Sequence, residues 1–269
     1  MLGFVPLLWL EGVKQKADLR ITMFQTLPRN KLFGRLVLIC TLGAFAGIFL
    51  IPLNPVNSKL LKLAFLGCVF GAWLGFTILA WTRKPVRVLA LVLPFLVAIP
   101  LALPGGEMNS DELRKDYLRR MTEFEDTKYF WGGESSRGID CSGLPRRALR
   151  DALLAYGINH FNGHAFRQYV EQWWYDASAQ ALAAGYRNYT SPLEVTGTIQ
   201  EMNYDTLVPG DLAVTTNGVH ILAYVGNEQW IQADPGIGAV ATLHGRKDDN
   251  TWFQAPVTMH RWQILEKNP

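Results

Sequence analysis

Hydrophobic and polar positions divide the chain into an apolar first part and a mixed second part. Residues 36–53, 63–81 and 88–104 contain no charged side chain. A helix needs ~20 apolar residues, within a range of roughly 17 to 25, to cross the hydrocarbon core of a membrane. The third segment is marginal in length and contains Pro94 and Pro100, which lipid-embedded helices tolerate. The pattern therefore predicts three membrane-spanning helices rather than buried helices of a soluble domain.

Basic residues indicate how these helices are oriented. Six lysines and arginines precede the first segment, two lysines separate it from the second, and the short connection to the third contains Arg83, Lys84 and Arg87. Because basic loops stay on the cytoplasmic side, we expect residues 1–35 to be a cytoplasmic segment that begins at the membrane interface. Three crossings then place the remainder on the periplasmic or outer face of a bacterial inner membrane. With two crossings it would stay inside.

The apolar part has the composition of an anchor. No ionisable residue lies within the three segments, so a transport or proton-relay role has no chemical basis. Membrane lipid is therefore an expected partner. Gly67, Gly71 and Gly75 follow the small-xxx-small spacing that lets helices approach closely, so they either mediate helix–helix association or reflect the general abundance of glycine in membrane helices.

The polar part, residues 106–269, begins with a helix signal and continues to a cysteine. Asn109 or Ser110 is a suitable cap for the first helix. A second helical periodicity starts at Leu144, and Pro145 fits only in its first turn. Gly157 is then the expected stop. This spacing places Cys141 at a helix N-terminus.

Cys141 is the only cysteine of the polar part, since Cys40 and Cys68 lie in apolar segments. A helix N-terminus favours an anion, which lowers the pKa of a thiol. An inert, packed cysteine would have apolar neighbours, whereas this one lies between Asp140 and Ser142. The pattern therefore favours a nucleophile.

A cysteine nucleophile needs a base and a group that orients the base. The runs around residues 211–216, 219–226 and 229–234 are typical of strands. A hairpin centred on Gly226 would bring His220 and Gln232 nearly opposite each other. Gln232 could then bind one imidazole nitrogen and leave the other facing the thiol, and Asp234 is the competing orienting group.

Four motifs in this order resemble the NlpC-type family of bacterial cell-wall cysteine peptidases. Its Tyr-x-Trp-Gly-Gly matches residues 129–133, its Asp-Cys-Ser-Gly-Leu residues 140–144 and its Gly-Asp-Leu residues 210–212. Its histidine matches His220, and its third polar position matches Gln232 before Ala233. The resemblance covers about residues 106–265 and implies a papain-like α+β fold, in which the nucleophile helix packs on an antiparallel sheet.

The resemblance also implies a function. Cys141 would attack an amide carbonyl, His220 would transfer the proton and Gln232 would orient the ring, with no cofactor and no metal. Tyr129 and the backbone of Cys141 would stabilise the oxyanion, and Asp140 and Ser142 would hold the free amine of the substrate. That substrate would be the stem peptide of peptidoglycan, cut between γ-D-glutamyl and a diamino acid, for wall remodelling or for attack on a rival's wall.

Other readings remain open at this point. The same nucleophile could serve an amidase or an acyltransferase acting on lipid, and the fold could serve a non-catalytic scaffold. Residues 158–209 form a longer insertion than the resemblance implies. This insertion either forms a wall of the substrate cleft or extends the core. His160 and His164 have the spacing of metal ligands, but Asn162 and Gly163 oppose a helix there. The net charge of +3 is too small to indicate nucleic-acid binding.

Overall fold

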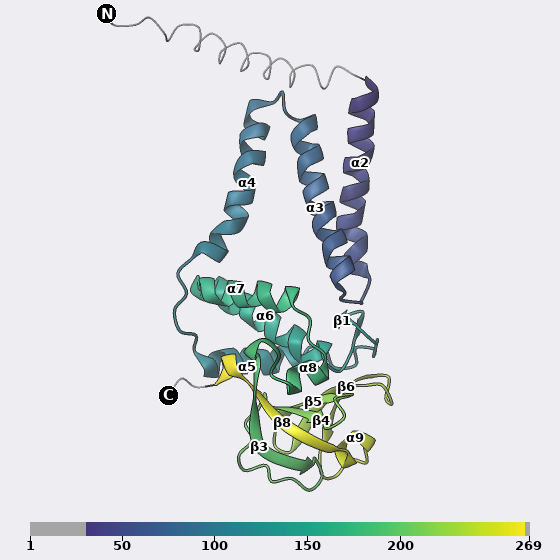
Figure 1. The fold of residues 1–269 in the computed structure, drawn as a ribbon, viewed down its shortest axis with the longest axis vertical. Helices are drawn as coiled ribbons and strands as arrows, with labels where there is room; N and C mark the ends of the chain where they lie inside the picture. The colour runs from purple at the N-terminus through teal and green to yellow at the C-terminus, as the bar shows by residue number, and fades with distance from the viewer. Residues whose placement is uncertain (1–30, 267–269) are drawn as a thin grey trace, which may run out of the picture. The chain divides into compact units, whose positions relative to one another are not determined.

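The structure, a computed structural model, describes residues 31–266. Residues 1–30, which make up most of the expected cytoplasmic segment and include its interfacial start, lie outside the described residues. The chain divides into two compact units. One comprises Met1–Pro52 with Leu63–Val97, and the other comprises Leu53–Lys62 with Ala98–Pro269. The second unit therefore contains the expected domain of residues 106–269 together with a piece of the connection between the first two apolar segments (Figure 1).

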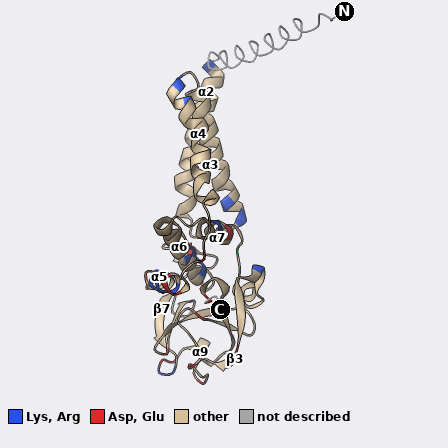
Figure 2. Cartoon of the chain, turned by 90° about the vertical axis from the view of Figure 1, so that its left-hand side faces the viewer, with Lys and Arg blue, Asp and Glu red and all other residues tan. Residues whose placement is uncertain are grey.

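The apolar part forms three long helices, α2 (Lys31–Leu50), α3 (Lys59–Leu79) and α4 (Lys84–Ala102), and the short 3-10 helix η2 (Ile51–Leu53) follows α2. Each is long and apolar enough to cross a membrane, over Lys31–Leu53, Lys59–Leu79 and Lys84–Ala102. Their charged residues lie toward the helix ends (Figure 2). The helices α3 and α4 begin a few residues before the uncharged segments because the flanking basic residues continue the helix.

Two of the three glycines of α3 lie against α2 of the same chain. A Cβ on Gly71 would lie 3.6 Å from the Cβ of Ala44, and a Cβ on Gly75 would collide with the side chain of Thr41. Gly67 has nothing within 4 Å of such an atom. The glycine spacing therefore serves close packing of α3 on α2, with Gly67 outside that contact.

The second unit combines helices with an antiparallel sheet. Its helices are α5 (Ser110–Thr122), α6 (Gly143–His160), α7 (Gly163–Trp174), α8 (Ala179–Ala183) and α9 (Thr251–Gln254), with the 3-10 helices η3 (Tyr186–Asn188) and η4 (Gln263–Leu265). Its strands are β1 (Glu134–Ser135), β2 (Gly138–Ile139), β3 (Thr190–Thr198), β4 (Leu212–Thr215), β5 (Ile221–Gly226), β6 (Gln229–Asp234), β7 (Ala239–His244) and β8 (Pro256–Trp262).

The main sheet has the order β3-β8-β4-β5-β6-β7, and every neighbouring pair is antiparallel. Side chains of a strand alternate between its two faces, and both faces are covered. On one face Ile221 and Ala223 pack with Leu149 of α6. On the other, Leu222 and Tyr224 pack in a second core. The predicted α+β fold, with a nucleophile helix on an antiparallel sheet, is confirmed.

Helix starts were predictable, and one helix end was not. Asn109 caps α5, where its side chain accepts hydrogen bonds from the backbone of Asp111 and Glu112. The expected stop at Gly157 is wrong, because α6 continues to His160 and ends at Phe161. A Cβ on Gly157 would lie 3.2 Å from the ring of Phe166 in α7. This glycine therefore permits close packing of two helices rather than ending one.

Candidate active site

Cys141 lies at the start of α6, as expected, and Asp140 organises that start. Ser142 is the cap position of α6. One carboxylate oxygen of Asp140 accepts hydrogen bonds from the Ser142 hydroxyl (3.0 Å) and from the Gly143 N–H (2.5 Å). The other oxygen accepts one from the Gly132 N–H at 2.9 Å. Asp140 therefore joins the loop of residues 129–133 to the nucleophile helix.

The pKa of the Cys141 thiol is set by its burial more than by its position at the helix start. Burial raises its pKa to about 12, and the neighbouring carboxylate of Asp140 acts in the same direction. The expected lowering of the pKa is therefore wrong. A helix terminus contributes only ~0.3–1 kcal/mol, less than one pKa unit, whereas burial shifts a pKa by several units. In addition, the Asp140 carboxylate already binds the free N–H group of Gly143.

His220 is held at the entrance to β5 by the end of β4. Its N–H donates to Oγ1 of Thr215 (3.0 Å), and its carbonyl accepts from the Thr215 N–H (3.0 Å). The preceding turn contains Gly218 with φ of +71°, where a Cβ would lie 2.8 Å from the Cβ of Gln180 in α8. The Sγ atom of Cys141 lies 3.9 Å from the carbonyl oxygen of Val219. The nucleophile thus lies against the segment that carries His220.

His220 and Gln232 contact each other directly. Nε2 of His220 lies 2.7 Å from Oε1 of Gln232. Because an amide oxygen only accepts hydrogen bonds, Nε2 carries the proton and Nδ1 is the free base. The register is shifted from the one expected, since Ala223 pairs with Ile231 and Tyr224 with Trp230. The two side chains therefore meet diagonally, from the same face of neighbouring strands.

Asp234, the competing orienting group, supports Gln232 instead of binding the imidazole. Its Oδ2 accepts hydrogen bonds from Nε2 of Gln232 (3.3 Å) and from Nδ2 of Asn250 (2.7 Å). The Gly236 N–H donates to its Oδ1 at 2.6 Å. Asp234 is 2% exposed. These bonds fix which end of the Gln232 amide faces His220.

Two further residues, Trp252 and Asn250, support this part of the site, and neither was predicted from the sequence. The indole of Trp252 stacks on the imidazole, with ring centroids 4.0 Å apart and planes inclined by 18°. Its Nε1 donates to Oδ1 of Asp234 at 3.3 Å. Asn250 caps the short helix α9 that carries Trp252. The only signal for them is an asparagine cap before an aromatic pair, which by itself indicates local structure.

Burial keeps the imidazole neutral. It lowers the pKa of His220 to about 4, although the hydrogen bond to Gln232 and the charge of Asp234 oppose this shift. Together with the raised pKa of the Cys141 thiol, this gives a neutral thiol and a neutral imidazole at physiological pH. A pair of this kind transfers its proton during attack and does not store a thiolate beforehand.

Tyr129 remains a suitable hydrogen-bond donor. Its backbone N–H donates to the carbonyl of Gly238 at 2.8 Å, which ties this residue to the turn between β6 and β7. Burial raises the pKa of its hydroxyl to about 12, and Cys141 and Asp140 contribute in the same direction. The hydroxyl therefore keeps its proton at neutral pH. Its role at an oxyanion, like the amine-binding roles of Asp140 and Ser142, remains a prediction.

Residues 158–209 extend the core and also support the site. Ala165, Ala179 and Leu182 are buried in the core shared with α6. His160 ends α6 and His164 lies in α7, with Asn162 capping the second helix, so the two histidines belong to different helices.

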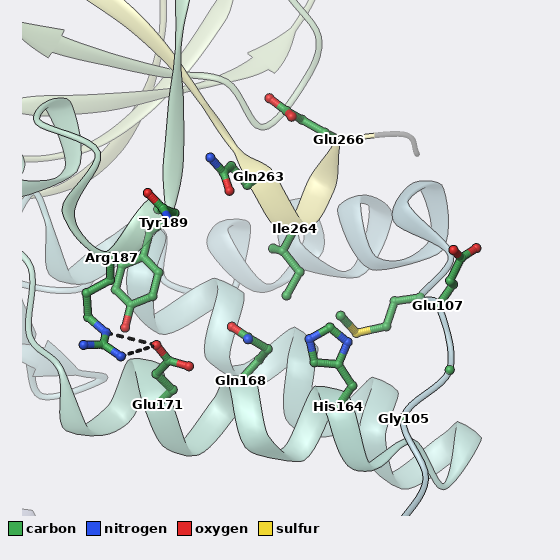
Figure 3. A pocket seen from close by; sticks show the side chains of 13 residues that line it. Gly105, Glu107, His164, Gln168, Glu171, Arg187, Tyr189, Gln263, Ile264 and Glu266 are labelled. Carbon is green, nitrogen blue, oxygen red and sulfur yellow. Dashed lines mark hydrogen bonds and ion pairs between the residues drawn. The ribbon is translucent and has the colours of Figure 1, made fainter. Parts of the chain in front are cut away.

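The same insertion also lines a hollow of about 460 Å³. Figure 3 shows His164 and Gln168 pointing into it from α7, and the Arg187 guanidinium beside the Glu171 carboxylate. Arg187 Nη2 donates to Oε1 of Glu171 at 2.8 Å. Cys141, His220 and Gln232 are not among the residues that line this hollow.

One family and several solved structures are similar to part of this chain. The NlpC/P60 family profile matches residues 126–257. NlpC1 from Trichomonas vaginalis is 18% identical, with a TM-score of 0.38, and the match covers 55% of this chain and 43% of that one. The peptidoglycan hydrolase RipB from Mycobacterium tuberculosis is 20% identical, with a TM-score of 0.36, over 59% of this chain and 68% of that one.

A third solved structure is the P60 domain of an antigen from M. avium subspecies paratuberculosis. It is 19% identical, with a TM-score of 0.35, over 59% of this chain and 98% of that one. This chain therefore spans less than half of the Trichomonas protein but nearly all of the isolated P60 domain. No curated protein matches the chain. The family match contains all three residues of the Cys141, His220 and Gln232 arrangement, and residues 126–257 are therefore an NlpC/P60 family domain, preceded in the chain by three long apolar helices.

Proposed function

We propose that the protein is a membrane-anchored cysteine peptidase that hydrolyses amide bonds in peptidoglycan stem peptides, between γ-D-glutamyl and a diamino acid. The observation that carries this proposal is the 2.7 Å contact between His220 and Gln232. It leaves Nδ1 as a free base on the segment before β5, which lies against Cys141. An amide hydrolase needs a base held in this orientation, whereas a non-catalytic scaffold does not.

The chemistry follows from the neutral resting pair. As Sγ of Cys141 bonds to the carbonyl carbon, its proton passes to Nδ1 of His220. The oxyanion is stabilised by the Cys141 N–H and the Tyr129 hydroxyl, and one such donor is worth ~3 kcal/mol. Collapse breaks the C–N bond, and the imidazolium returns its proton to the leaving amine. Water, deprotonated by His220, then hydrolyses the thioester and frees Cys141.

The fold of the second unit supports a domain placed on the outer face of a bacterial inner membrane. Residues 53–62 belong to the same compact unit as the NlpC/P60 domain. Both must then lie on one side of the membrane, so α3 and α4, which connect them, must both cross. The basic loop with Arg83 and Arg87 would lie on the opposite, cytoplasmic side. This arrangement requires three crossings, with residues 1–35 inside, 36–104 as the anchor and 106–269 outside.

The test uses the full chain in lipid nanodiscs, because residues 53–62 would be missing from a soluble fragment. Purified muropeptides are incubated with the wild type, with Cys141→Ala and with Cys40→Ala, and the products are identified by mass spectrometry. Cys40→Ala is the matched control, since it removes a thiol from an apolar helix. We expect a new amine and a new carboxylate at one bond of the stem peptide with the wild type and the control only.

Other results would redirect the proposal. Activity retained in Cys141→Ala would assign the cleavage to a contaminant. Intact muropeptides together with acyl transfer to or from nanodisc lipid would indicate an amidase or acyltransferase that acts on lipid. A protein that is folded but inactive on both substrates, with a Cys141 that does not react with electrophiles, would be a scaffold. Remodelling of the cell's own wall and attack on a rival's wall would give the same products. The topology of the protein and its expression in a producing cell distinguish these two roles.

A further inference from the structure

We propose that residues 55–57, from the connection between α2 and α3, are a positioning strand for the nucleophile loop (residues 129–141), and that Asn57 and Glu134 are the positioning residues. The active site would then be complete only in a chain that carries its membrane segment. This inference rests on the proposed function for its activity readout, but the geometry that carries it is independent of the substrate.

The segment lies antiparallel beside the hairpin of β1 and β2, through one bridge and two backbone hydrogen bonds. Val56 pairs with Gly133 in an antiparallel bridge. The Asn57 N–H donates to the carbonyl of Gly132 at 2.9 Å, and the Glu134 N–H donates to the carbonyl of Pro55 at 2.9 Å. A two-stranded hairpin of two residues per strand is marginal by itself, and a further strand stabilises it. The positioning strand thus pairs with the edge that contains the Gly-Gly motif.

That edge is joined directly to the nucleophile. The Gly132 N–H donates to Oδ2 of Asp140 at 2.9 Å, and the Asp140 N–H donates to the carbonyl of Gly133 at 3.0 Å. Asp140 precedes Cys141 and binds the first N–H group of α6, that of Gly143. Only one residue, Gly132, therefore separates the backbone of Asn57 from the carboxylate that organises the nucleophile helix.

A buried ion cluster connects the same elements through side chains. Glu134 is 3% exposed. Its Oε2 accepts hydrogen bonds from Nδ2 of Asn57 and, at 2.7 Å, from Nη1 of Arg150 in α6. Arg146, also in α6, lies 3.5 Å from its other oxygen and donates from Nε to the carbonyl of Ser142 at 3.1 Å. One carboxylate thus holds both the positioning strand and the first turns of the nucleophile helix.

The charge balance of this cluster explains why Asn57 is needed. Lys62, in the first turn of α3, is 4% exposed, and its ammonium has no hydrogen-bond partner among the described residues. Two guanidinium groups and an ammonium therefore surround the Glu134 carboxylate, while Asp176 pairs with Arg146 at the edge of the cluster. Removing one partner of a buried charge is costly. Asn57 supplies Oε2 of Glu134 with a neutral donor and adds no further positive charge.

The decisive experiment compares Asn57→Ala and Asn57→Pro with Asn54→Ala in the full chain in nanodiscs. The alanine variant removes only the side-chain bond to Glu134, and the proline variant also removes the N–H bond to Gly132. Asn54 lies on the same connection just before the positioning strand, and its Oδ1 accepts a hydrogen bond from the Val56 N–H and not from Gly132 or Glu134. The readouts are kcat and KM for muropeptides, the rate of Cys141 alkylation, the melting temperature, and hydrogen exchange of residues 130–136.

We expect kcat to fall about 10-fold in Asn57→Ala and about 100-fold in Asn57→Pro, because a displacement of ~1 Å at a reacting group costs ~10²-fold. KM should change little and exchange at residues 130–136 should accelerate, while the melting temperature should fall because the buried Glu134 carboxylate loses a partner. Unchanged kcat, alkylation and exchange in both folded variants would overturn the proposal. Should the proline variant fail to fold, the alanine variant alone decides.

Failure of this inference and failure of the proposed function give different results. If the wild type does not cut muropeptides, the function falls, while alkylation and hydrogen exchange still report whether the strand positions Cys141. If the wild type cuts them and Asn57→Ala matches Asn54→Ala in every readout, the function stands and the positioning role falls. A merely structural role of Asn57 would lower the melting temperature and leave the kcat of the folded fraction unchanged.

Discussion

The Nε2 atom of His220 lies 2.7 Å from Oε1 of Gln232, and Gln232 is completely buried. The other end of the amide donates to Asp234, so the side chain cannot reverse without losing both bonds. This relationship fixes the imidazole in one tautomer, with Nδ1 free to accept a proton. The site therefore contains a base prepared for a thiol, although the thiol itself is un-ionised at rest.

Replacement of Gln232 by alanine should lower kcat by about 100-fold, with little change in KM. The imidazole would lose the acceptor that selects its tautomer and orientation, which acts in the transition state and not in substrate binding. Steady-state kinetics on muropeptides measures the effect. Gln229→Ala, on the same strand but exposed to solvent, is the matched control and should leave kcat unchanged. A drop of equal size in both variants would contradict the orienting role.

Activity should have an acid limb near pH 4 and no alkaline limb near neutrality. The base works only when unprotonated, so kcat/KM should rise as the pH rises through the pKa of His220, about 4. The Cys141 thiol, with a pKa of about 12, stays protonated throughout the accessible range. A bell-shaped profile with limbs near 4 and 8 would instead indicate a preformed thiolate–imidazolium pair.

The lowered pKa of His220 also makes the stability of the fold depend on pH. The pKa of His220 is lower in the folded state than the ordinary value of 6.5, so the unfolded chain takes up a proton first as the pH falls. The contribution of His220 to the free energy of unfolding is complete above pH ~6.5 and is lost toward pH ~4. Melting temperatures recorded at each pH separate this loss from the kinetic acid limb.

Removal of the Trp252 indole should move the acid limb to higher pH. Trp252 covers one face of the imidazole, and water admitted by Trp252→Ala would reduce the desolvation that lowers the pKa of His220. We expect the limb in kcat/KM to rise by about one unit, with a smaller rise in Trp252→Phe, which keeps an aromatic ring there. Thr251→Ala, exposed on the same short helix, should not move it. An unchanged limb in Trp252→Ala would show that the indole does not shield the base.

Asp211, in the Gly-Asp-Leu motif, should prove structural. It is fully buried, and its two oxygens each accept a hydrogen bond of 2.7 Å from Arg261 of β8. Asp211→Asn should lower the free energy of unfolding by about 3 kcal/mol, the lower end for a broken buried ion pair, because Arg261 is partly exposed. Thermal unfolding of the full chain measures it. Asp205→Asn, on an exposed turn, is the control, and an equal effect in both variants would refute the assignment.

Local signals predicted the parts of this protein that depend on neighbouring residues. Three uncharged runs became α2, α3 and α4, and Asn109 caps α5. Pro145 correctly placed the start of α6 beside Cys141. Gly157 misled because a glycine that ends a helix and one that admits a neighbouring ring look the same in a sequence.

The protonation state and the supports of the site were decided by tertiary structure alone. Asn57, Asn250 and Trp252 reach the site from segments 77, 16 and 18 residues away from their partners, with no periodicity or motif to mark them. The sequence determined that Cys141 lies beside the start of a helix and that His220 and Gln232 share a face, because both depend on backbone geometry over a few residues. The burial that raises one pKa and lowers the other depends on everything packed around the pair, and only the folded chain contains that information.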